Sequence, residues 1–306
     1  MKPIVIQSLP TSLVEAELLA VRLGVTAGEI AVHTFPDGEI RVTVKSAPAV
    51  AIVYASLDRP NDKLLTLMLA SEAYRRSGVR RLVLVAPYLC YMRQDAAFQP
   101  GEAISQKVVG GLLASAFDRI VTVDAHLHRT SDIREVFPGI EADNLSAMPA
   151  IADSLRATGF DRTAIVVGPD AESEIWVSDL AARLELPYMA ARKTRLGDRS
   201  VEIELPSPHA VAGRPVLLVD DLVSSGGTLA VCARVLRAAG ATSIDVLVTH
   251  ALFPPETTHE LARAGIRSVR STNSVPHATN AIALDGLLAQ VLEGEIEQTT
   301  LRTSLT

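Results

Sequence analysis

Apolar runs that suit buried strands alternate along the chain with segments whose apolar positions recur at helical spacing. The strand-like runs lie at 4–8, 39–44, 51–55, 81–86, 119–123, 164–168, 187–190, 216–219 and 243–249. The amphipathic segments lie at 13–23, 62–77, 103–115 and 178–184. This alternation predicts an α/β protein with mostly parallel sheets that are flanked by helices.

A loop-like stretch, PGIEADNLSAMP, interrupts this pattern near residues 140–150. It predicts two domains of similar size, 1–143 and 144–290, each with its own α/β sheet. Residues 291–306 are predicted to form a polar C-terminal tail.

The most informative segment is VLLVDDLVSSGGT at 216–228. An apolar strand is followed by two carboxylates, then by a loop of small residues that leads into a helix. Main-chain N–H groups in such a loop and at a helix N-terminus bind anions. Acids next to an anion site suit a ligand with hydroxyl groups, or one that brings a cation. The segment therefore predicts a ribose-phosphate site. Its expected residues are Asp220 and Asp221 for ring hydroxyls, and Ser224, Ser225, Gly226, Gly227 and Thr228 for the phosphate.

Polar clusters also follow other predicted strands, where parallel sheets bind their ligands. Arg93 and Gln94 follow the strand at 81–86; arginine suits a polyphosphate and glutamine can hydrogen-bond a base edge. Asp170 follows the strand at 164–168, and its carboxylate could hold a divalent cation.

A further cluster, Asp124, His126 and His128, follows the strand at 119–123. The spacing of the two histidines is also that of a metal pair in some barrel-shaped hydrolases. His126 is therefore a candidate ligand for a substrate or a metal, and a structural histidine is the alternative.

Two predicted turns carry further candidates. In FPDGEIRV, Gly38 predicts a hairpin turn, with Asp37 and Glu39 on either side and Phe35 nearby. In RKTRLGDRSVEIEL, Lys193 and Arg195 precede a Gly-Asp turn, and this basic loop could close over phosphates.

Composition narrows the function classes. The chain has 306 residues, of which 48% are apolar, and a formal net charge of −6, which argues against a nucleic-acid surface. Cys90 and Cys232 lie in apolar sequence and predict buried thiols rather than a disulfide or zinc site. Neither a signal peptide nor a membrane span is predicted, so a cytoplasmic protein is expected. P-loop and dinucleotide-binding motifs are absent from the sequence.

Six segments, taken in their order along the chain, resemble the ribose-phosphate pyrophosphokinase family, the phosphoribosyl pyrophosphate synthetases. These segments are FPDGE, PYLCYMRQD, VDAH, GPD, K-x-R and VDDLVSSGGT. The resemblance covers nearly the whole chain, and its basic loop is most similar to that of archaeal members. It implies two phosphoribosyltransferase-like domains with the active site between them. It also implies transfer of the diphosphoryl group of ATP to the C1 hydroxyl of ribose 5-phosphate, giving phosphoribosyl diphosphate and AMP.

The resemblance also implies roles for individual residues. Lys193 would be catalytic with Arg195 as its companion, and His126 and Asp170 would bind Mg²⁺ or its waters. Asp220, Asp221 and residues 224–228 would hold ribose 5-phosphate. The residues implied for ATP are Phe35, Asp37, Gly38, Glu39, Arg93 and Gln94. A homo-oligomer is implied, either a dimer or a hexamer, in which a neighbouring subunit completes the ATP pocket.

Three alternatives stay open at this point. A non-catalytic relative would bind and regulate a true synthetase. A phosphoribosyltransferase would explain VDDLVSSGGT but not FPDGE or RQD. A metal-dependent hydrolase would need further histidine ligands after strands, and His209, His250 and His277 do not follow such a pattern.

Overall fold

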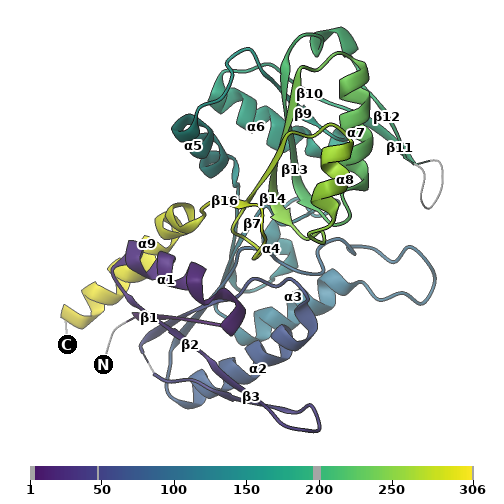
Figure 1. Cartoon of the computed structure of the whole chain (residues 1–306). Coiled ribbons are helices and arrows are strands. Elements are labelled where there is room, and N and C mark those ends of the chain that lie inside the picture. Colours follow the sequence, from purple (N-terminus) through teal and green to yellow (C-terminus); the bar gives the residue numbers. More distant parts are fainter. Residues whose placement is uncertain (1–3, 47, 196–200, 305–306) are drawn as a thin grey trace. The chain divides into compact units, whose positions relative to one another are not determined.

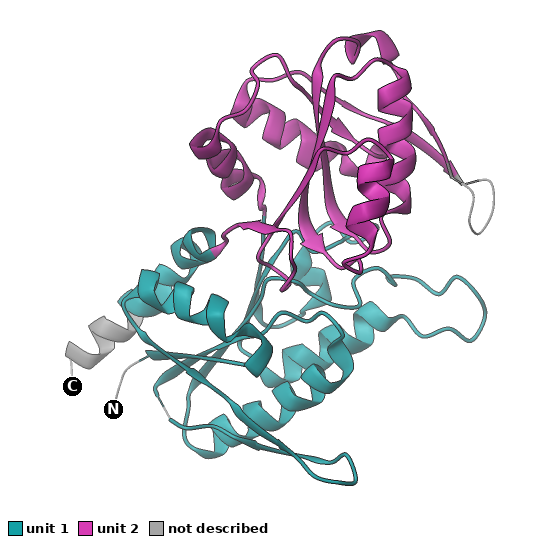
Figure 2. Cartoon of the chain, viewed as in Figure 1, with its two compact units in different colours: residues 1–145, 285–306 teal, residues 146–284 magenta. Residues whose placement is uncertain are grey.

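The computed structural model describes residues 4–46, 48–195 and 201–304, without the side chains of 195, 201 and 298–304 (Figure 1). The chain divides into two compact units (Figure 2). Unit 1 comprises Met1–Leu145 and Asp285–Thr306, and unit 2 comprises Ser146–Leu284. The domain bounds expected from the sequence, 1–143, 144–290 and 291–306, stay predictions, while the structure groups the C-terminal helix with unit 1.

Unit 1 is built on a six-stranded parallel sheet of order β2-β1-β5-β6-β7-β8. The strands are β1 (Ile4–Ser8), β2 (Thr26–Glu29), β5 (Val50–Tyr54), β6 (Arg81–Ala86), β7 (Arg119–Val123) and β8 (Glu141–Leu145). A separate antiparallel hairpin joins β3 (Ala31–Thr34) to β4 (Ile40–Thr43). The helices are α1 (Leu13–Leu23), α2 (Pro60–Arg76), α3 (Ser105–Ala116), α4 (Ile133–Val136) and α9 (Asp285–Ser304).

Unit 2 has a second six-stranded parallel sheet, of order β10-β9-β13-β14-β15-β16. Its strands are β9 (Ile165–Gly168), β10 (Tyr188–Ala190), β13 (Pro215–Val223), β14 (Ser243–Ala251), β15 (Ser268–Thr272) and β16 (Asn280–Ile282). A hairpin joins β11 (Arg192–Arg195) to β12 (Val201–Glu204). The helices are α5 (Met148–Thr158), α6 (Glu174–Leu184), α7 (Gly227–Ala238) and α8 (Thr257–Arg263).

The predicted α/β class with mostly parallel sheets is confirmed. Parallel strands covered by helices on both faces are buried throughout, so they are apolar runs rather than alternating patterns. Strand β5 is buried at every position, as is β9. Cys90 and Cys232 are buried free thiols, as predicted.

One predicted element bound is corrected by the structure. The strand predicted at 216–219 continues to Val223, because β14 pairs with it as far as Leu222↔His250 and Val223↔Ala251. Asp220 and Asp221 therefore belong to the strand itself. Residues 291–304, within the segment predicted as a polar tail, belong to α9. Its buried Glu295 accepts hydrogen bonds from Arg81 and Arg119 of the unit 1 sheet.

Across the residues that the structure describes, no helix is both long enough and apolar enough to span a membrane.

Candidate functional site

The carboxyl edge of the unit 2 sheet brings together residues that are far apart in the sequence. Asp170 follows β9, Asp220 lies near the end of β13, and Lys193 lies on β11. The Lys193 Nζ atom is 3.2 Å from Asp170 Oδ2, and each of the two side chains is less than one fifth exposed, at 19% and 17%. This ion pair holds the lysine ammonium at the edge where ligands of parallel sheets bind.

The charge balance at this edge is negative. Removal from water raises the pKa of the Asp220 carboxyl well above its usual range, and the neighbouring carboxylates of Asp221 and Asp170 raise it further. The hydrogen bond from the Asp221 amide and the charge of Lys193 oppose this shift. Since the two lowering effects do not cancel the raising ones, the net shift is upward. The cluster therefore favours binding of a cation or of a hydrogen-bond donor.

The loop after β13 leads directly into α7. Gly226 stands at the N-terminal cap of α7 with φ +76°, a conformation that a residue with Cβ rarely adopts. A Cβ atom here would lie 2.5 Å from Thr257 Cγ2 on α8. Two independent features therefore require glycine at position 226, namely its positive φ angle and the close approach of α8. Ser224, Ser225 and Gly227 are exposed around it, and Thr228 is half-buried in the first turn of α7.

Asp170 is fixed by a contact that the sequence analysis missed. The hydroxyl of Ser173 donates to the main-chain oxygen of Asp170. Gly168 leaves the space for this turn, because a Cβ atom there would lie 1.9 Å from Ser173 Oγ. A glycine at the end of a predicted strand was the available signal, since it often marks a close approach of side chain to backbone.

The basic loop is confirmed as a hairpin in its backbone, with Arg195 paired to Val201 and Lys193 to Ile203. The side chain of Arg195 and residues 196–200, which include Arg199, lie outside the described residues. The proposed role of Arg195 therefore rests on its place in the K-x-R motif.

In unit 1, four candidate residues lie on the tip of the β3–β4 hairpin. Phe35 and Glu39 close the turn by a main-chain hydrogen bond of 2.8 Å, and Gly38 adopts φ +91°. The Asp37 carboxylate accepts from the Glu39 amide at 3.1 Å. The Phe35 ring, 38% exposed, stacks edge-on against His33. The tip thus presents an aromatic ring and two acids to solvent.

Arg93 and Gln94 lie on a segment held by hydrogen bonds on both sides. The Gln94 side-chain oxygen accepts from Ser105 Oγ at 2.6 Å. Next to it, the Asp95 side chain is 1% exposed and accepts from the main-chain amide and the guanidinium of Arg129, at 3.0 and 2.7 Å. Burial raises the pKa of Asp95, but the hydrogen bonds from Arg129 outweigh it and leave the pKa below its usual range.

His126 and His128 lie close together in the loop that follows β7. Their Nε2 atoms are 2.8 Å apart and the rings meet edge-on. The loop begins at Asp124, which is buried and has φ +39°. A non-glycine residue in this conformation is costly and is found most often at functional sites.

Unit 2 has donors of the type that a hard divalent cation prefers, although the oxygens of Asp170, Asp220 and Asp221 do not form a converging three-ligand group among the described residues. Asp170, Asp220 and Asp221 offer carboxylate oxygens, which Mg²⁺ prefers over nitrogen and sulfur. Burial, and after it the charges of Asp221 and Asp170, raise the pKa of Asp220, and a bound cation would stabilise its ionised form. In unit 1, His126 offers an imidazole nitrogen, which suits contact through a metal-bound water.

Comparisons with known proteins cover both units. Residues 4–116 match the family model of the N-terminal domain of ribose phosphate pyrophosphokinase, and residues 144–284 match that of the phosphoribosyl transferase domain. The chain is 32% identical to ribose-phosphate pyrophosphokinase 2 of Archaeoglobus fulgidus, over 92% of this chain and 97% of that one. It is 33% identical to the ribose-phosphate pyrophosphokinase of Thermococcus kodakarensis, over 84% and 89%.

A solved structure is similar over the whole length. The phosphoribosylpyrophosphate synthetase from Mycobacterium smegmatis superposes with a TM-score of 0.84 at 26% identity. The match covers 97% of this chain and 100% of that chain.

Proposed function

Because the chain belongs to the ribose-phosphate pyrophosphokinase family, we propose that it transfers the diphosphoryl group of ATP to the C1 hydroxyl of ribose 5-phosphate. The products are phosphoribosyl diphosphate and AMP, so the enzyme is a ribose-phosphate diphosphokinase, a transferase that supplies nucleotide biosynthesis. The observation that carries the assignment is the group of Asp170, Lys193 and Asp220 at one sheet edge, beside the glycine-containing loop at 224–228.

We assign ribose 5-phosphate to unit 2. The main-chain N–H groups around Gly226 and the first turn of α7 suit the 5-phosphate, with the hydroxyls of Ser224, Ser225 and Thr228 beside them. Gly227 gives the phosphate room to approach the backbone. The carboxyls of Asp220 and Asp221 suit the ring hydroxyls, because a carboxylate accepts hydrogen bonds from neighbouring alcohols.

We assign ATP to unit 1, through Arg93 and Gln94 and through the hairpin tip that carries Phe35, Asp37, Gly38 and Glu39. The tip is exposed, as a surface that completes the ATP pocket of a neighbouring subunit has to be. The proposal therefore includes a homo-oligomer, either a dimer or a hexamer.

The oligomer is tested by complementation. Asp37→Ala and Lys193→Ala chains should each be inactive alone. When both chains are expressed together, mixed oligomers should recover part of the activity if the tip acts in the neighbouring subunit. A tip that acts within its own subunit gives no recovery.

Mg²⁺ is proposed as the metal of the reaction, with Asp170 and His126 as ligands of the ion or of its waters. When bound, the ion would neutralise phosphate oxygens and align the polyphosphate. The family is metal-dependent, and the carboxylate cluster of unit 2 supports an oxygen-preferring ion.

The chain's own residues supply the remaining chemistry. The C1 oxygen attacks the β-phosphorus, and the bond from that phosphorus to the oxygen that bridges the α- and β-phosphates breaks, so AMP leaves with that oxygen. The proton of the C1 hydroxyl is released to solvent. This reaction needs positioning and charge neutralisation more than covalent catalysis. Lys193 and Arg195 are assigned to the charge that develops on the transferred group. A basic hairpin that closes over the substrates would also exclude water, which would otherwise hydrolyse ATP.

One assay tests the function. The full chain is incubated with ATP, ribose 5-phosphate and Mg²⁺, and the nucleotides are separated. AMP and phosphoribosyl diphosphate should form in equal amounts. Formation of ADP would indicate an ordinary kinase. Substrate binding without turnover would indicate a non-catalytic relative and would refute the proposal.

A phosphoribosyltransferase explains less of the chain. It accounts for residues 144–284, but residues 4–116 match the N-terminal domain of ribose phosphate pyrophosphokinase instead. Incubation with phosphoribosyl diphosphate and free nucleobases should accordingly give no nucleotide.

A further inference from the structure

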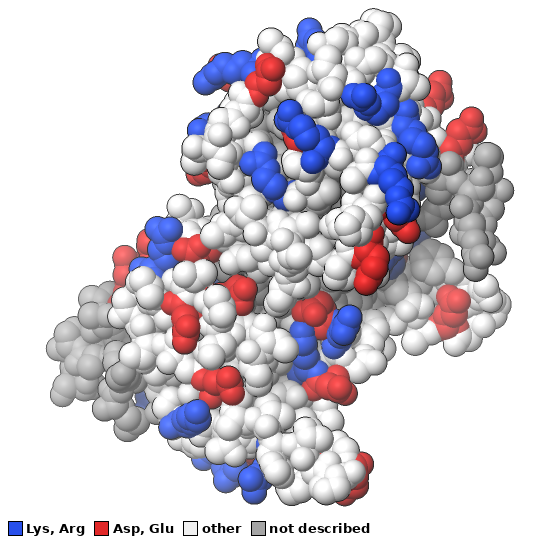
Figure 3. Space-filling view, viewed as in Figure 1, with Lys and Arg blue, Asp and Glu red and all other residues white. Residues whose placement is uncertain are grey.

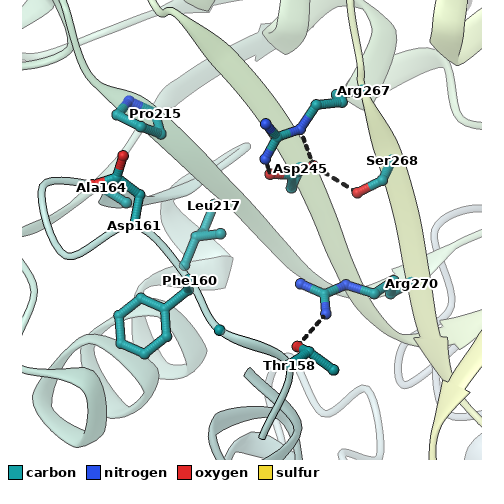
Figure 4. A pocket seen from close by; sticks show the side chains of 11 residues that line it. Thr158, Phe160, Asp161, Ala164, Pro215, Leu217, Asp245, Arg267, Ser268 and Arg270 are labelled. Atoms are coloured by element: carbon teal, nitrogen blue, oxygen red, sulfur yellow. Dashed lines mark hydrogen bonds and ion pairs between the residues drawn. The ribbon is translucent and has the colours of Figure 1, made fainter. Parts of the chain in front are cut away.

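A cavity of about 290 Å³ lies at the amino-terminal edge of the unit 2 sheet (Figure 4). It is lined by the first residues of β13, β14 and β15 and by the segment between α5 and β9. Leu217, Asp245 and Ser268 are cross-strand neighbours on its wall. Asp220 stands three residues beyond Leu217, roughly 10 Å further along the strand. The cavity therefore lies at the opposite edge of the sheet from the residues assigned to ribose 5-phosphate.

One wall of the cavity carries a compensated charge. The Asp245 side chain, 9% exposed, accepts two hydrogen bonds from the Arg267 guanidinium and one of 2.6 Å from Ser268 Oγ. Burial raises the pKa of Asp245, but these hydrogen bonds outweigh it and leave the pKa below its usual range. The carboxylate is thus ionised and already satisfied, which limits its repulsion of a second anion.

Another wall carries a positive charge, that of Arg270, which acts on Asp245 only through space and not through a direct ion pair. The half-buried Arg270 donates from Nη1 to Thr158 Oγ1 at 3.2 Å, and Thr158 in turn donates to the Ser154 main-chain oxygen. Within the part of the chain that is described, Arg270 forms no ion pair with a carboxylate. Since a guanidinium has five N–H donors, Arg270 keeps donors for a ligand while Thr158 fixes its orientation.

The second acid in the lining, Asp161, forms no ion pair that would neutralise the charge of Arg270. Asp161 is exposed, and its carboxylate accepts from the amide and hydroxyl of Thr163 in its own loop. On the face shown in Figure 3, lysine and arginine side chains are prominent across unit 2, and aspartate and glutamate side chains lie at its margins. The surroundings thus favour an anion over a cation.

The rest of the lining is apolar and includes Pro215, Leu217, Ala164 and Phe160. A closed apolar cavity of about 150 Å³ holds a benzene molecule, so this one has room for a ring and a charged group. The geometry points to a binding site for a small organic anion. Its carboxylate or phosphate oxygens pair with Arg270, and its apolar body packs against Leu217 and Pro215. This site is independent of the proposed reaction.

Benzoate and phenyl phosphate are suitable probes, with benzyl alcohol as the uncharged analogue. Binding to the full chain is measured by ligand-observed NMR, with ribose 5-phosphate present at saturation to occupy its own site. Ligands of this size should bind with Kd on the order of 1 mM. Benzyl alcohol should bind markedly more weakly, because it lacks the charge.

Variants assign the binding to the cavity. Arg270→Gln should weaken the binding of the anions by about tenfold or more, as expected for loss of a charge-assisted hydrogen bond. Thr158→Val keeps the shape but removes the hydroxyl that orients Arg270, and should weaken binding by a smaller factor. Arg183→Gln is the matched control, since it removes an arginine of the same unit that lies outside the cavity.

Each outcome decides the proposal. Binding of either anion that is lost in Arg270→Gln supports it, and a preference between the two probes identifies the head group. Absence of binding by both anions when ribose 5-phosphate is present, equal binding of benzyl alcohol, or unchanged binding in Arg270→Gln overturns it. If Arg270→Gln does not fold, unchanged binding in Thr158→Val overturns it instead. None of these results depends on turnover, so failure here is distinct from failure of the proposed function.

Discussion

The two units share one topology and differ at the point where it places ligands. Unit 1 has the strand order β2-β1-β5-β6-β7-β8 and unit 2 the order β10-β9-β13-β14-β15-β16, which are equivalent along the chain. The order reverses between β1 and β5, and between β9 and β13. Ligands of such sheets bind beyond the carboxyl ends of the strands at this switch point. Unit 2 has Asp170 and Asp220 there, whereas unit 1 has Ser8 and Ser56.

The turn that follows the switch point is also conserved in conformation but not in chemistry. In unit 2 the cap of α7 is Gly226, with φ +76°, and in unit 1 the cap of α2 is Arg59, with φ +46°. Pro60 then occupies the first turn of α2 and removes one N–H group. Asp58 is paired with Lys63 at 2.6 Å. The same turn thus occurs in both units, with glycine at the helix cap and aspartates at the strand end in unit 2, and with arginine, proline and a paired aspartate in unit 1.

The largest effect is expected from removing the positively charged side chain of Lys193 in unit 2. Lys193→Ala should lower kcat by about 10²–10³ while the fold is retained, because one preorganised charge in the transition state is lost. Arg192→Ala is the matched control, since Arg192 is an exposed neighbour on the same strand. Steady-state kinetics of AMP formation measure both. Wild-type rates in Lys193→Ala would remove Lys193 from the mechanism.

Gly226→Ala tests the turn itself. The left-handed backbone costs a residue with Cβ roughly 1–2 kcal/mol, and the methyl group also meets Thr257. We expect lower stability in urea unfolding and a KM for ribose 5-phosphate raised by about tenfold. Gly227→Ala is the control for stability, because its Cβ would meet only Ser225 Oγ at 3.7 Å and its φ is not positive. Equal stability of the two variants would contradict this account of the turn.

The sequence pattern was sufficient to predict an element's bounds where the element is buried on all sides or along one face. The bounds predicted for β1 and α1, 4–8 and 13–23, agree with the structure, because one is a continuous apolar run and the other is amphipathic. Strand β8 (Glu141–Leu145) was missed. Its residues are only partly buried, and its sequence EADNL has no apolar pattern.

Contacts between distant residues could not be obtained from the sequence in the same way. The pairing of Lys193 with Asp170 joins the β11–β12 hairpin to the segment that follows β9, 23 residues earlier in the chain. The roles of Ser173 and Thr257 depend on atoms that approach Gly168 and Gly226. The glycines were visible as exceptional positions, but the residues that press against them were not. The roles assigned to the site residues stay predictions until the variants are measured.

A smaller effect is expected from Asp220→Asn, measured as thermal stability without Mg²⁺. The folded pKa of Asp220 is raised, so the folded state retains a proton that the unfolded state loses. The wild type should therefore lose stability, relative to the variant, as pH rises from the ordinary range of aspartate through the raised pKa. At neutral pH we expect the variant to melt a few degrees higher.

Two comparisons sharpen the Asp220 prediction. Mg²⁺ should narrow the gap by stabilising the wild type, because the ion binds the folded carboxylates. Asp153→Asn removes an exposed carboxylate of the same unit, and should show no such pH dependence. A gap that does not change with pH would contradict the raised pKa of Asp220.

The smallest effect is expected from Arg59→Gly, which gives unit 1 the residue type that unit 2 has at the same turn. Relief of the left-handed conformation stabilises the fold by about 1–2 kcal/mol, and the greater freedom of glycine in the unfolded chain offsets part of this. A net gain of about 0.5–1 kcal/mol should appear in urea unfolding. Arg76→Gly, at the last residue of α2, should instead lower the stability. No left-handed conformation is relieved there, and glycine is a poor helix former. If both variants lose stability equally, the turns of the two units are not equivalent, and the glycine of unit 2 would then serve only its contact with α8.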